Sequence, residues 1–199
     1  YTLKYETLEY ENQHPVSFVN WLPLDPMYHN SEFIENDKVR EYDNDLEIVD
    51  FRKYYKTDLV KTGIYAAYHA YPYYPDFVYL DKKYQKGDNN YLPYLQDLKN
   101  HCPDMPLIIA EYGVPSSRGN SNYTPYGFNQ GGHKEKEQAR INKLLTEDIH
   151  KSQCGGAIMF EWIDEWFKFN WMVMAFEQPQ HRRKYWHNKE NPEQNFGIV

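Results

Sequence analysis

The sequence lacks the features that mark several large classes of protein. It has no basic stripe, and its 22 Lys and Arg against 29 Asp and Glu give a net charge of −7. The sequence therefore lacks the cluster of basic residues that binds nucleic-acid phosphates, and we expect no nucleic-acid partner. The longest apolar runs have the length of strands, well short of the roughly 20 residues that a membrane-spanning helix needs.

Cysteine is scarce as well. The two cysteines, Cys102 and Cys154, have no Cys-x-x-Cys spacing and define neither a disulfide framework nor a zinc site. Free buried thiols are the default for such residues. No metal-binding histidine spacing occurs, and no glycine-rich phosphate fingerprint follows any expected strand. We expect neither a metal nor another cofactor.

A starting methionine is also missing, since residue 1 is Tyr. We expect further sequence upstream of Tyr1, where a signal peptide or membrane anchor can lie. For the full-length protein, a location outside the cytoplasm or at a membrane is the leading expectation.

Aromatic side chains, in contrast, are abundant. The 20 Tyr, 10 Phe and 5 Trp make up 18% of the residues. Sugar rings stack well on such rings, which have apolar faces and polar tips. Composition by itself favours a plainer interpretation, in which the tyrosines belong to an ordinary Tyr-rich surface.

The pattern of apolar runs alternates between strands and helices along one partial domain, residues 1–199. Strands are expected over residues 16–21, 64–70, 106–113 and 157–162. Helices are expected over residues 2–13, 91–100 and 133–152. Continuous apolar strands between helices predict an α/β fold with a parallel sheet.

The remaining segments are polar. Residues 29–50 are either a functional loop or hide short elements, and residues 114–132 and 163–176 are expected to be loops. The polar tail, residues 177–199, can lead into a further domain, and its last four residues are expected to begin a strand.

A carboxylate marks the end of the third expected strand. Residues 106–110 are apolar, and Glu111 follows where this buried strand meets its loop. A carboxylate at such a point is rigidly held and partly desolvated, as a nucleophile or general acid must be. The competing interpretation is a structural ion pair, for which Arg118 is the local partner.

Polar and aromatic residues gather at the other strand ends too. In a parallel α/β fold these ends lie at one edge of the sheet, where functional groups collect. They are Asn20 and Trp21 at the end of the first strand, His69 and Tyr71 at the end of the second, and Glu161, Trp162, Asp164, Glu165 and Trp166 at or just beyond the end of the fourth. Trp162 fits a platform beneath a sugar ring, whereas each of the acids can equally well cap its loop.

Residues 106–113 and 156–162 resemble strands seven and eight of the retaining glycoside hydrolases built on (β/α)8 barrels, the cellulase and β-galactosidase superfamily. In that superfamily a Glu ending strand seven is the nucleophile, and a Trp ending strand eight lines the sugar site. Glu111 and Trp162 match these positions, and His69 or Tyr71 matches the His or Tyr usual at strand six. The resemblance implies the C-terminal half of a TIM barrel, strands five to eight.

A closer resemblance is to glycosyl-hydrolase-like TIM-barrel proteins found alongside family 2 glycosyltransferases. It covers about residues 15–199 and is carried by motifs at residues 20–26, 69–75, 110–119, 130–133 and 160–168. It implies a carbohydrate partner, with Glu111 as the catalytic residue. The substrate-binding residues that it implies are Asn20, Trp21, His69, Tyr71, Arg118, Glu161, Trp162, Asp164, Glu165 and Trp166.

One departure from the superfamily concerns the second carboxylate. Retaining hydrolysis needs an acid about 5–5.5 Å from the nucleophile, and the superfamily carries it in an Asn-Glu pair ending strand four. This sequence has no Asn-Glu pair. Because a full barrel takes about 250 residues, we expect strand four and its acid upstream of Tyr1, and a chain that is inactive alone.

A further expectation follows from half a barrel. Its open face exposes apolar side chains and strand edges, so either two copies associate through it or the long loops cover it.

A non-catalytic carbohydrate-binding or scaffold module linked to polysaccharide synthesis is the alternative function. A free-standing hydrolase of another class is disfavoured, because no Gly-x-Ser-x-Gly elbow is present.

Overall fold

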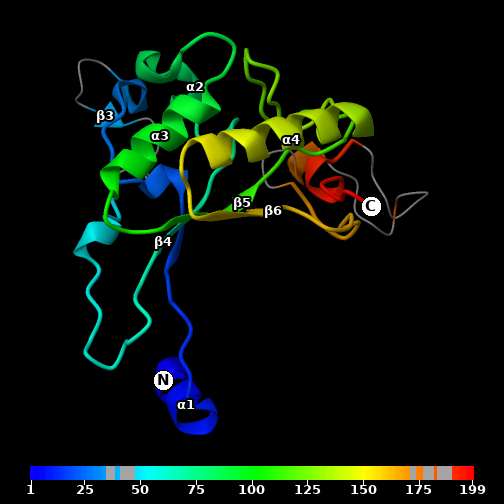
Figure 1. Cartoon of the computed structure of the whole chain (residues 1–199). Helices are drawn as coiled ribbons and strands as arrows, with labels where there is room; N and C mark the ends of the chain where they lie inside the picture. The colour runs from blue at the N-terminus through cyan, green and yellow to red at the C-terminus, as the bar shows by residue number, and fades with distance from the viewer. Residues whose placement is uncertain (35–38, 41–47, 171–173, 177–181, 183–189) are drawn as a thin grey trace.

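A computed structural model of the chain describes residues 1–34, 39–40, 48–170, 174–176, 182 and 190–199. At its centre is a four-stranded parallel sheet with the strand order β1-β4-β5-β6 (Figure 1). The strands are β1 (Val19–Trp21), β4 (Ala66–His69), β5 (Leu107–Tyr112) and β6 (Gly156–Met159). Each falls on a predicted strand, and the predicted α/β fold with a parallel sheet is confirmed.

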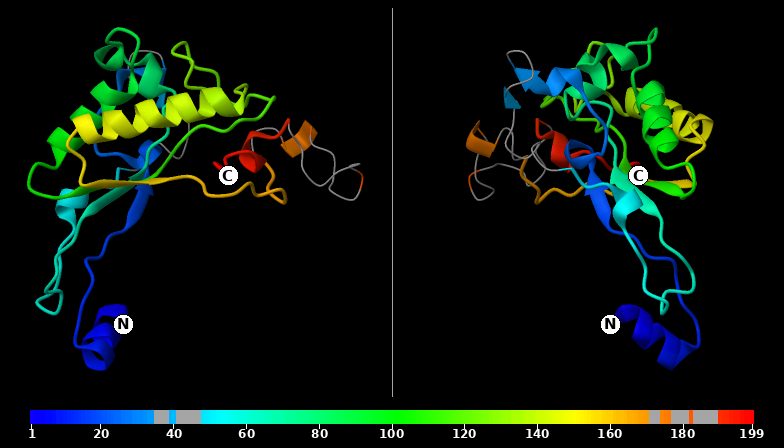
Figure 2. Two further views of the ribbon diagram at one scale, coloured as in Figure 1. Left: turned by 45° about the vertical axis from the view of Figure 1, so that its right-hand side comes forward. Right: turned by 90° about the vertical axis from the view of Figure 1, so that its left-hand side faces the viewer.

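Two long helices cover one face of this sheet. They are α3 (Tyr91–His101) and α4 (Glu135–Lys151), and they lie side by side on the same side of the strands in all three views (Figures 1 and 2). The apolar stripe of α4 turns Ile141, Leu145 and Ile149 inward, and all three are buried. The helices predicted over residues 91–100 and 133–152 are therefore confirmed. Burial of an apolar stripe stabilises a helix more than intrinsic propensity does.

A third helix, α1 (Thr2–Tyr10), stands apart from the sheet (Figures 1 and 2) and has no buried residue. Beyond α1 the chain is tied to the loop that precedes β4 through Gln13, which donates to the Leu59 carbonyl and accepts from the Lys61 amide, at 2.9 and 2.8 Å. The helix predicted over residues 2–13 is confirmed for its first nine residues. Across the described ranges, no helix combines the length and the apolar character needed to traverse a bilayer.

Several short elements occupy the connections. Residues 29–50 hide short elements, one of the two predicted possibilities, and residues 35–38 and 41–47 of this stretch lie outside the described residues. The short elements are α2 (Phe77–Leu80), the antiparallel pair β2 (Phe33–Ile34) and β3 (Val39–Arg40), and the 3-10 helices η1 (Leu22–Leu24), η2 (Asn30–Glu32), η4 (Phe51–Lys53), η5 (Lys82–Tyr84), η6 (Met174–Phe176) and η8 (Pro192–Gln194).

Many of the tyrosines belong to the core. Within the described ranges six are buried, and four of these, Tyr68, Tyr84, Tyr91 and Tyr94, are at most 1% exposed. Their hydroxyls have acceptors inside the protein: Tyr91, for example, donates to the Ala70 carbonyl at 2.8 Å. The plain interpretation of a Tyr-rich surface is therefore wrong for these residues, because a buried phenol is stable once its hydroxyl is bonded.

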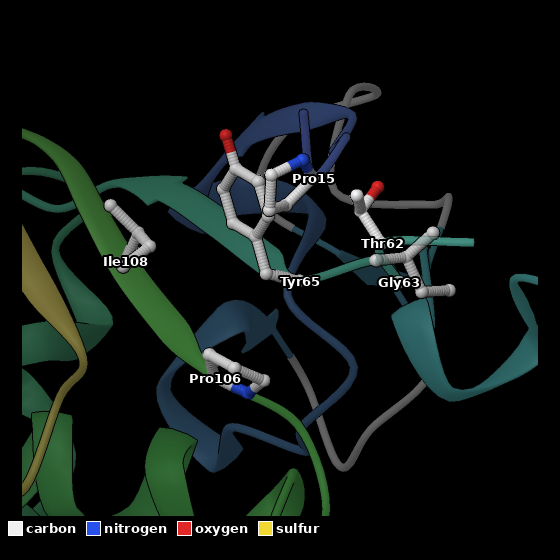
Figure 3. A pocket seen from close by; sticks show the side chains of 7 residues that line it. Pro15, Thr62, Gly63, Tyr65, Pro106 and Ile108 are labelled. Carbon is white, nitrogen blue, oxygen red and sulfur yellow. The ribbon is translucent and has the colours of Figure 1, made fainter. Parts of the chain in front are cut away.

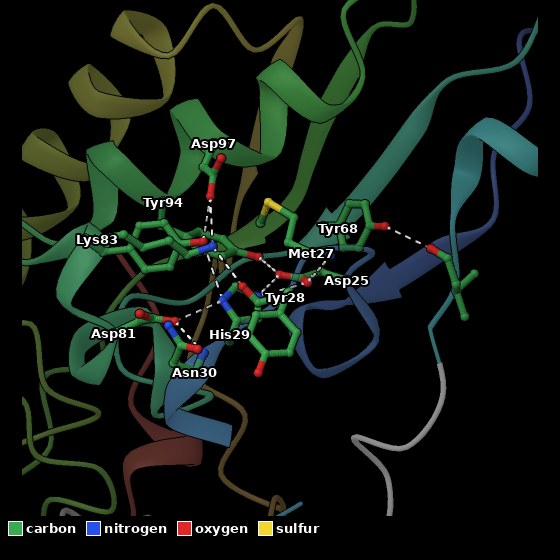
Figure 4. A network of polar contacts seen from close by, with 12 residues as sticks. Asp25, Met27, Tyr28, His29, Asn30, Tyr68, Asp81, Lys83, Tyr94 and Asp97 are labelled. Carbon is green, nitrogen blue, oxygen red and sulfur yellow. Dashed lines mark hydrogen bonds and ion pairs between the residues drawn. The ribbon is translucent and has the colours of Figure 1, made fainter. Parts of the chain in front are cut away.

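A buried network of polar contacts holds the loop that follows β1 (Figure 4). Asp25 Oδ2 lies 2.9 Å from Nε2 of His29 and accepts a hydrogen bond from the Tyr94 hydroxyl at 2.7 Å. The His29 ring stacks on Phe77 with the centroids 3.7 Å apart, and its Nδ1 lies 3.7 Å from Asp81. Since Tyr94 belongs to α3 and Phe77 to α2, the network joins this loop to both helices.

The other face of the sheet carries exposed apolar side chains. Val19 and Ile108 occupy the same register row and therefore the same face, because paired residues of neighbouring parallel strands point the same way. Ile158 lies on that face too, two residues after Gly156, which pairs with Ile108. Val19 is 55% exposed and Ile158 is 60% exposed. The described loops leave these edge positions uncovered.

Replacing Asp25 with Ala should destabilise the fold. Removing this carboxylate leaves His29 and the Tyr94 hydroxyl buried without their shared acceptor, which costs about 3–5 kcal/mol for a buried pair that loses one partner. The free energy of unfolding, measured from urea denaturation curves, reports the loss. Asp58→Ala, at an exposed position, is the control and should change it by less than about 0.5 kcal/mol. Equal effects of the two substitutions would contradict a stabilising role of the network.

Candidate functional site

Three neighbouring strands bring Trp21, His69 and Glu111 into one row at the C-terminal edge of the sheet. Trp21 pairs with His69 across β1 and β4, and His69 pairs with Glu111 across β4 and β5. The register of β5 shifts against both of its neighbours at this point. Such an irregularity re-aims a side chain, and here Glu111, rather than Ala110, lies opposite His69.

The Glu111 carboxylate is held by two side chains from the neighbouring strand end. His69 Nδ1 lies 3.0 Å from Oε2 of Glu111, and the Tyr71 hydroxyl donates to the same oxygen at 2.9 Å. Burial acts to raise the pKa of Glu111, but the hydrogen bonds from His69 and Tyr71 and the charges of His69 and Lys168 outweigh it, so the pKa lies below its usual value. Glu111 is therefore ionised at neutral pH, as a nucleophile must be.

Tyr71 is a dependable donor in this arrangement. Burial first, and then the nearby Tyr73 and Glu111, raise the pKa of its hydroxyl above the usual range for tyrosine. The hydroxyl therefore keeps its proton and stays available to the carboxylate.

Glu111 opens into a cleft of about 250 Å³ walled mainly by aromatic rings. Among these rings, Trp21 and Tyr74 contact each other with centroids 5.8 Å apart, and Phe160 meets Phe196 edge to face at 5.1 Å. The lining residues are Trp21, Tyr71, Tyr73, Tyr74, Glu111, Asn122, Gln130, Phe160, Lys168, Glu193 and Phe196. Apolar walls with a few placed polar groups are typical of small-molecule sites.

One wall of the cleft is built by the C-terminal segment, residues 190–198. The Ser116 amide, in the loop after β5, donates to the Asn195 carbonyl at 2.8 Å, and the Glu161 amide, after β6, donates to the Phe196 carbonyl at 3.4 Å. Phe196 is only 1% exposed. The prediction that residues 196–199 begin a strand is wrong, because this segment docks on two strand ends as a 3-10 helix and an extended stretch.

Acidic residues surround Lys168, the one cation among the described residues that line the cleft. Lys168 forms an ion pair with Glu165, and its ammonium lies 4.3 Å from the centroid of the Phe160 ring. Burial, together with the nearby Glu165 and Glu193, raises the pKa of Glu161 to about 7, although Lys168 acts in the opposite direction. Neither Glu161 nor Glu165 lines the cleft itself.

The other predicted site residues lie away from this cleft. Asn20 donates to the Tyr54 hydroxyl at 3.1 Å. Arg118 and Asp164 line a separate pocket. Trp162 and Trp166 are 69% and 52% exposed.

Of the predicted residues, the structure thus brings Trp21, His69 and Tyr71 together with Glu111. The alternative of a Glu111–Arg118 ion pair is not realised, because the partners of Glu111 are His69 and Tyr71.

The sequence missed much of the cleft wall. Tyr73, Tyr74, Gln130 and Lys168 lie inside motifs that the resemblance had marked, so a signal for them existed. Glu193 lies in a polar tail without periodicity, where nothing in the sequence distinguishes it.

A second cavity, of about 460 Å³, lies at the opposite end of the strands (Figure 3). Its lining includes Pro15, Tyr65, Pro106 and Ile108 and carries no carboxylate, imidazole or amine. No group of three or more His, Cys, Asp or Glu within the described ranges is arranged to hold a metal ion.

Replacing His69 with Ala should raise the pKa of Glu111, since the variant loses a hydrogen bond and a favourable charge while burial remains. A carboxyl whose folded pKa is depressed contributes stability above its unfolded pKa and loses it as pH falls through the folded value. The variant should therefore lose less stability than the parent on acidification. Carboxyl NMR titration and unfolding at several pH values measure the two effects.

His14→Ala is the matched control for this pair of measurements, because His14 pairs with Glu6, and its own side chain is 72% exposed. An unchanged Glu111 titration in His69→Ala would contradict the role assigned to His69.

The geometry of this cleft is the basis for any assignment of function. No protein-family profile matches the chain, and no curated protein does either.

Proposed function

We propose that this chain is a glycoside-hydrolase-like domain that binds a carbohydrate in the cleft, with Glu111 as the nucleophile of a retaining mechanism. One observation carries the proposal: the Glu111 carboxylate, kept ionised by His69 and Tyr71, opens at a strand end into a cleft with aromatic walls. Aromatic faces stack on the C–H faces of sugar rings, and a rigid carboxylate beside them can reach the anomeric carbon.

The order of the strands supports assigning them to half of a (β/α)8 barrel, as strands five to eight. The sheet order β1-β4-β5-β6 follows the chain without reversal, and α3 and α4 share one face. A doubly wound sheet reverses its order at a switch point and carries helices on both faces. Repeated right-handed crossovers in one direction put every helix on the same side, as in a barrel.

In the proposed reaction the protein contributes position and charge. Both contacts of the carboxylate with neighbouring side chains fall on Oε2 of Glu111, so Oε1 is the oxygen that attacks the anomeric carbon. His69 and Tyr71 fix the orientation of the carboxylate, which makes the attack effectively intramolecular once a sugar is bound.

A second candidate function is a carbohydrate-binding or scaffold module without catalysis, linked to polysaccharide synthesis. It is favoured by the composition of the cleft, where Trp21, Tyr73, Tyr74, Phe160 and Phe196 offer stacking surface regardless of any chemistry. Glu111 would then only accept hydrogen bonds from sugar hydroxyls.

The substitution Glu111→Gln separates these candidates. In a retaining hydrolase it should abolish turnover of aryl glycosides but leave binding of the same sugars within a few fold, because the amide keeps the shape of the side chain and loses its nucleophilicity. Chromophore release and isothermal titration calorimetry measure the two. Glu147→Gln, at an α4 position whose side chain is 47% exposed, should change neither. Sugar binding by a parent protein without turnover would favour the scaffold.

We also propose that two copies of the chain associate through the open sheet face, where Val19 and Ile158 are exposed. Burying such side chains in a shared interface removes apolar area from water. Sedimentation velocity should therefore show a dimer that Ile158→Glu converts to monomer. The control Leu8→Glu, on α1 at a position 69% exposed, should leave the dimer intact. A monomeric parent chain would exclude this association.

A further inference from the structure

The cleft contains a second carboxylate, Glu193, that comes from the C-terminal segment and not from any strand end. It lines the same cavity as Glu111, and it belongs to η8, the 3-10 helix Pro192–Gln194. The resemblance to retaining hydrolases implies a second acid at the end of strand four, upstream of Tyr1. The structure instead brings a carboxylate of this chain into the cleft from the other end of the sequence.

Hydrogen bonds hold both the backbone and the side chain of Glu193 in place. Its backbone amide donates to the Asn191 side chain at 2.9 Å, which caps η8. Its Oε1 accepts a hydrogen bond from Gln130 Nε2 at 2.5 Å, and Asn122 in turn donates to Gln130 Oε1 at 2.5 Å. The loop after β5 therefore aims this side chain through a chain of two amides.

η8 is itself anchored to the loop after β6. The side chains of Asn191 and Gln194 both donate to the Lys168 carbonyl, at 3.1 and 2.6 Å. Lys168 also lines the cleft. The carboxylate of Glu193 is thus positioned by the loops of the two strands that flank the cleft.

The two carboxylates of the cleft differ in their electrostatic surroundings. Burial raises the pKa of Glu193, and the negative charges of Glu111 and Glu165 raise it further, against the opposing effects of Lys168 and Gln130. The pKa of Glu111 is shifted downward in the same cleft. Two carboxyls whose environments drive their pKa values apart are the arrangement that divides the nucleophile from the acid.

We propose that Glu193 is the acid–base residue that works with Glu111 on a glycoside bound in the cleft. This inference rests on the proposed function and adds its second catalytic residue. It replaces the expectation that the acid lies upstream of Tyr1 and that the chain is inactive alone. Glu161 and Glu165 are less suited to the role, because neither lines the cavity that Glu111 and Glu193 both line.

The reaction balances in two steps. First, the carboxyl proton of Glu193 passes to the glycosidic oxygen as the bond from that oxygen to the anomeric carbon breaks, while Oε1 of Glu111 bonds to that carbon and the alcohol leaves. Then Glu193, now a carboxylate, takes a proton from water, whose oxygen bonds to the anomeric carbon as the Glu111 ester breaks. Water is the only co-reactant, and both residues return to their starting states.

Glu193→Gln tests this proposal in the whole chain, with dinitrophenyl and methoxyphenyl β-glycosides of glucose, galactose, mannose and xylose as probes. The dinitrophenolate leaves without protonation, whereas the methoxyphenolate needs an acid. The variant should lose about 10²–10⁴-fold in kcat on the methoxyphenyl substrate. On the dinitrophenyl substrate it should release a burst and accumulate a sugar on Glu111, detectable by mass spectrometry. Added azide should restore turnover, since this nucleophile needs no base.

The pH profile gives a readout that a purely structural role would not move. The parent should lose kcat/KM at alkaline pH as Glu193 gives up its proton, and Glu193→Gln should lack this limb on the dinitrophenyl substrate. The carboxamide oxygen of the new side chain can still accept from Gln130, so the melting temperature should stay near that of the parent. Glu190→Gln, an exposed position in the same segment, is the matched control.

The outcomes separate the two levels of the proposal. Equal losses on both leaving groups in Glu193→Gln with an unchanged pH profile, or behaviour identical to Glu190→Gln, would overturn the assignment of Glu193 and leave the proposed function standing. Glu111→Gln should be inactive on both substrates and should not respond to azide. A parent chain that cleaves none of the probes and forms no adduct on Glu111 would overturn the proposed function itself.

Discussion

The two hydrogen bonds that Glu111 receives, from His69 and from Tyr71, connect the end of β5 to the end of β4 and set the chemistry of the whole cleft. They require that Glu111 points along the same face as His69, and this depends on the register shift of β5 against its neighbours. Regular pairing would place Ala110 opposite His69. A local irregularity of the backbone is therefore what turns a strand-end acid into an ionised and oriented carboxylate.

The rest of the molecule holds that row of side chains in place. α3 and α4 bury the helix-facing side of the sheet, and the Asp25–His29 network fixes the loop after β1 against α2 and α3. Buried tyrosines pack in the core, and the hydroxyls of Tyr84, Tyr91 and Tyr94 are bonded to a carbonyl or a carboxylate. A rigid scaffold of this kind keeps the side chains of the cleft in a fixed geometry.

The C-terminal segment forms one wall of the cleft, on a side where no described strand lies. Gly197 shows how closely it docks, since a Cβ at this position would lie 2.5 Å from the Asp164 amide nitrogen, in the loop after β6. Through this contact and the docking of Phe196, a tail that looks like a linker becomes a wall of the site. The loops that follow β5 and β6 thus act together with the tail: the first contributes the amides of Asn122 and Gln130 to the cleft, the second Lys168, and the tail Glu193.

The sequence by itself determined the order of the four sheet strands and of the helices α1, α3 and α4, because the apolar runs of the strands and the apolar stripe of α4 are local patterns. It also located Glu111, Trp21, His69 and Tyr71 at strand ends, which parallel strands must bring to one edge. Only the tertiary structure decided that Glu111 bonds to His69 and Tyr71 rather than to Arg118, and that Trp162 and Asn20 lie outside the cleft. The same holds for Glu193, because its place depends on contacts between residues far apart in the chain, such as its bond to Gln130, which leave no local signature.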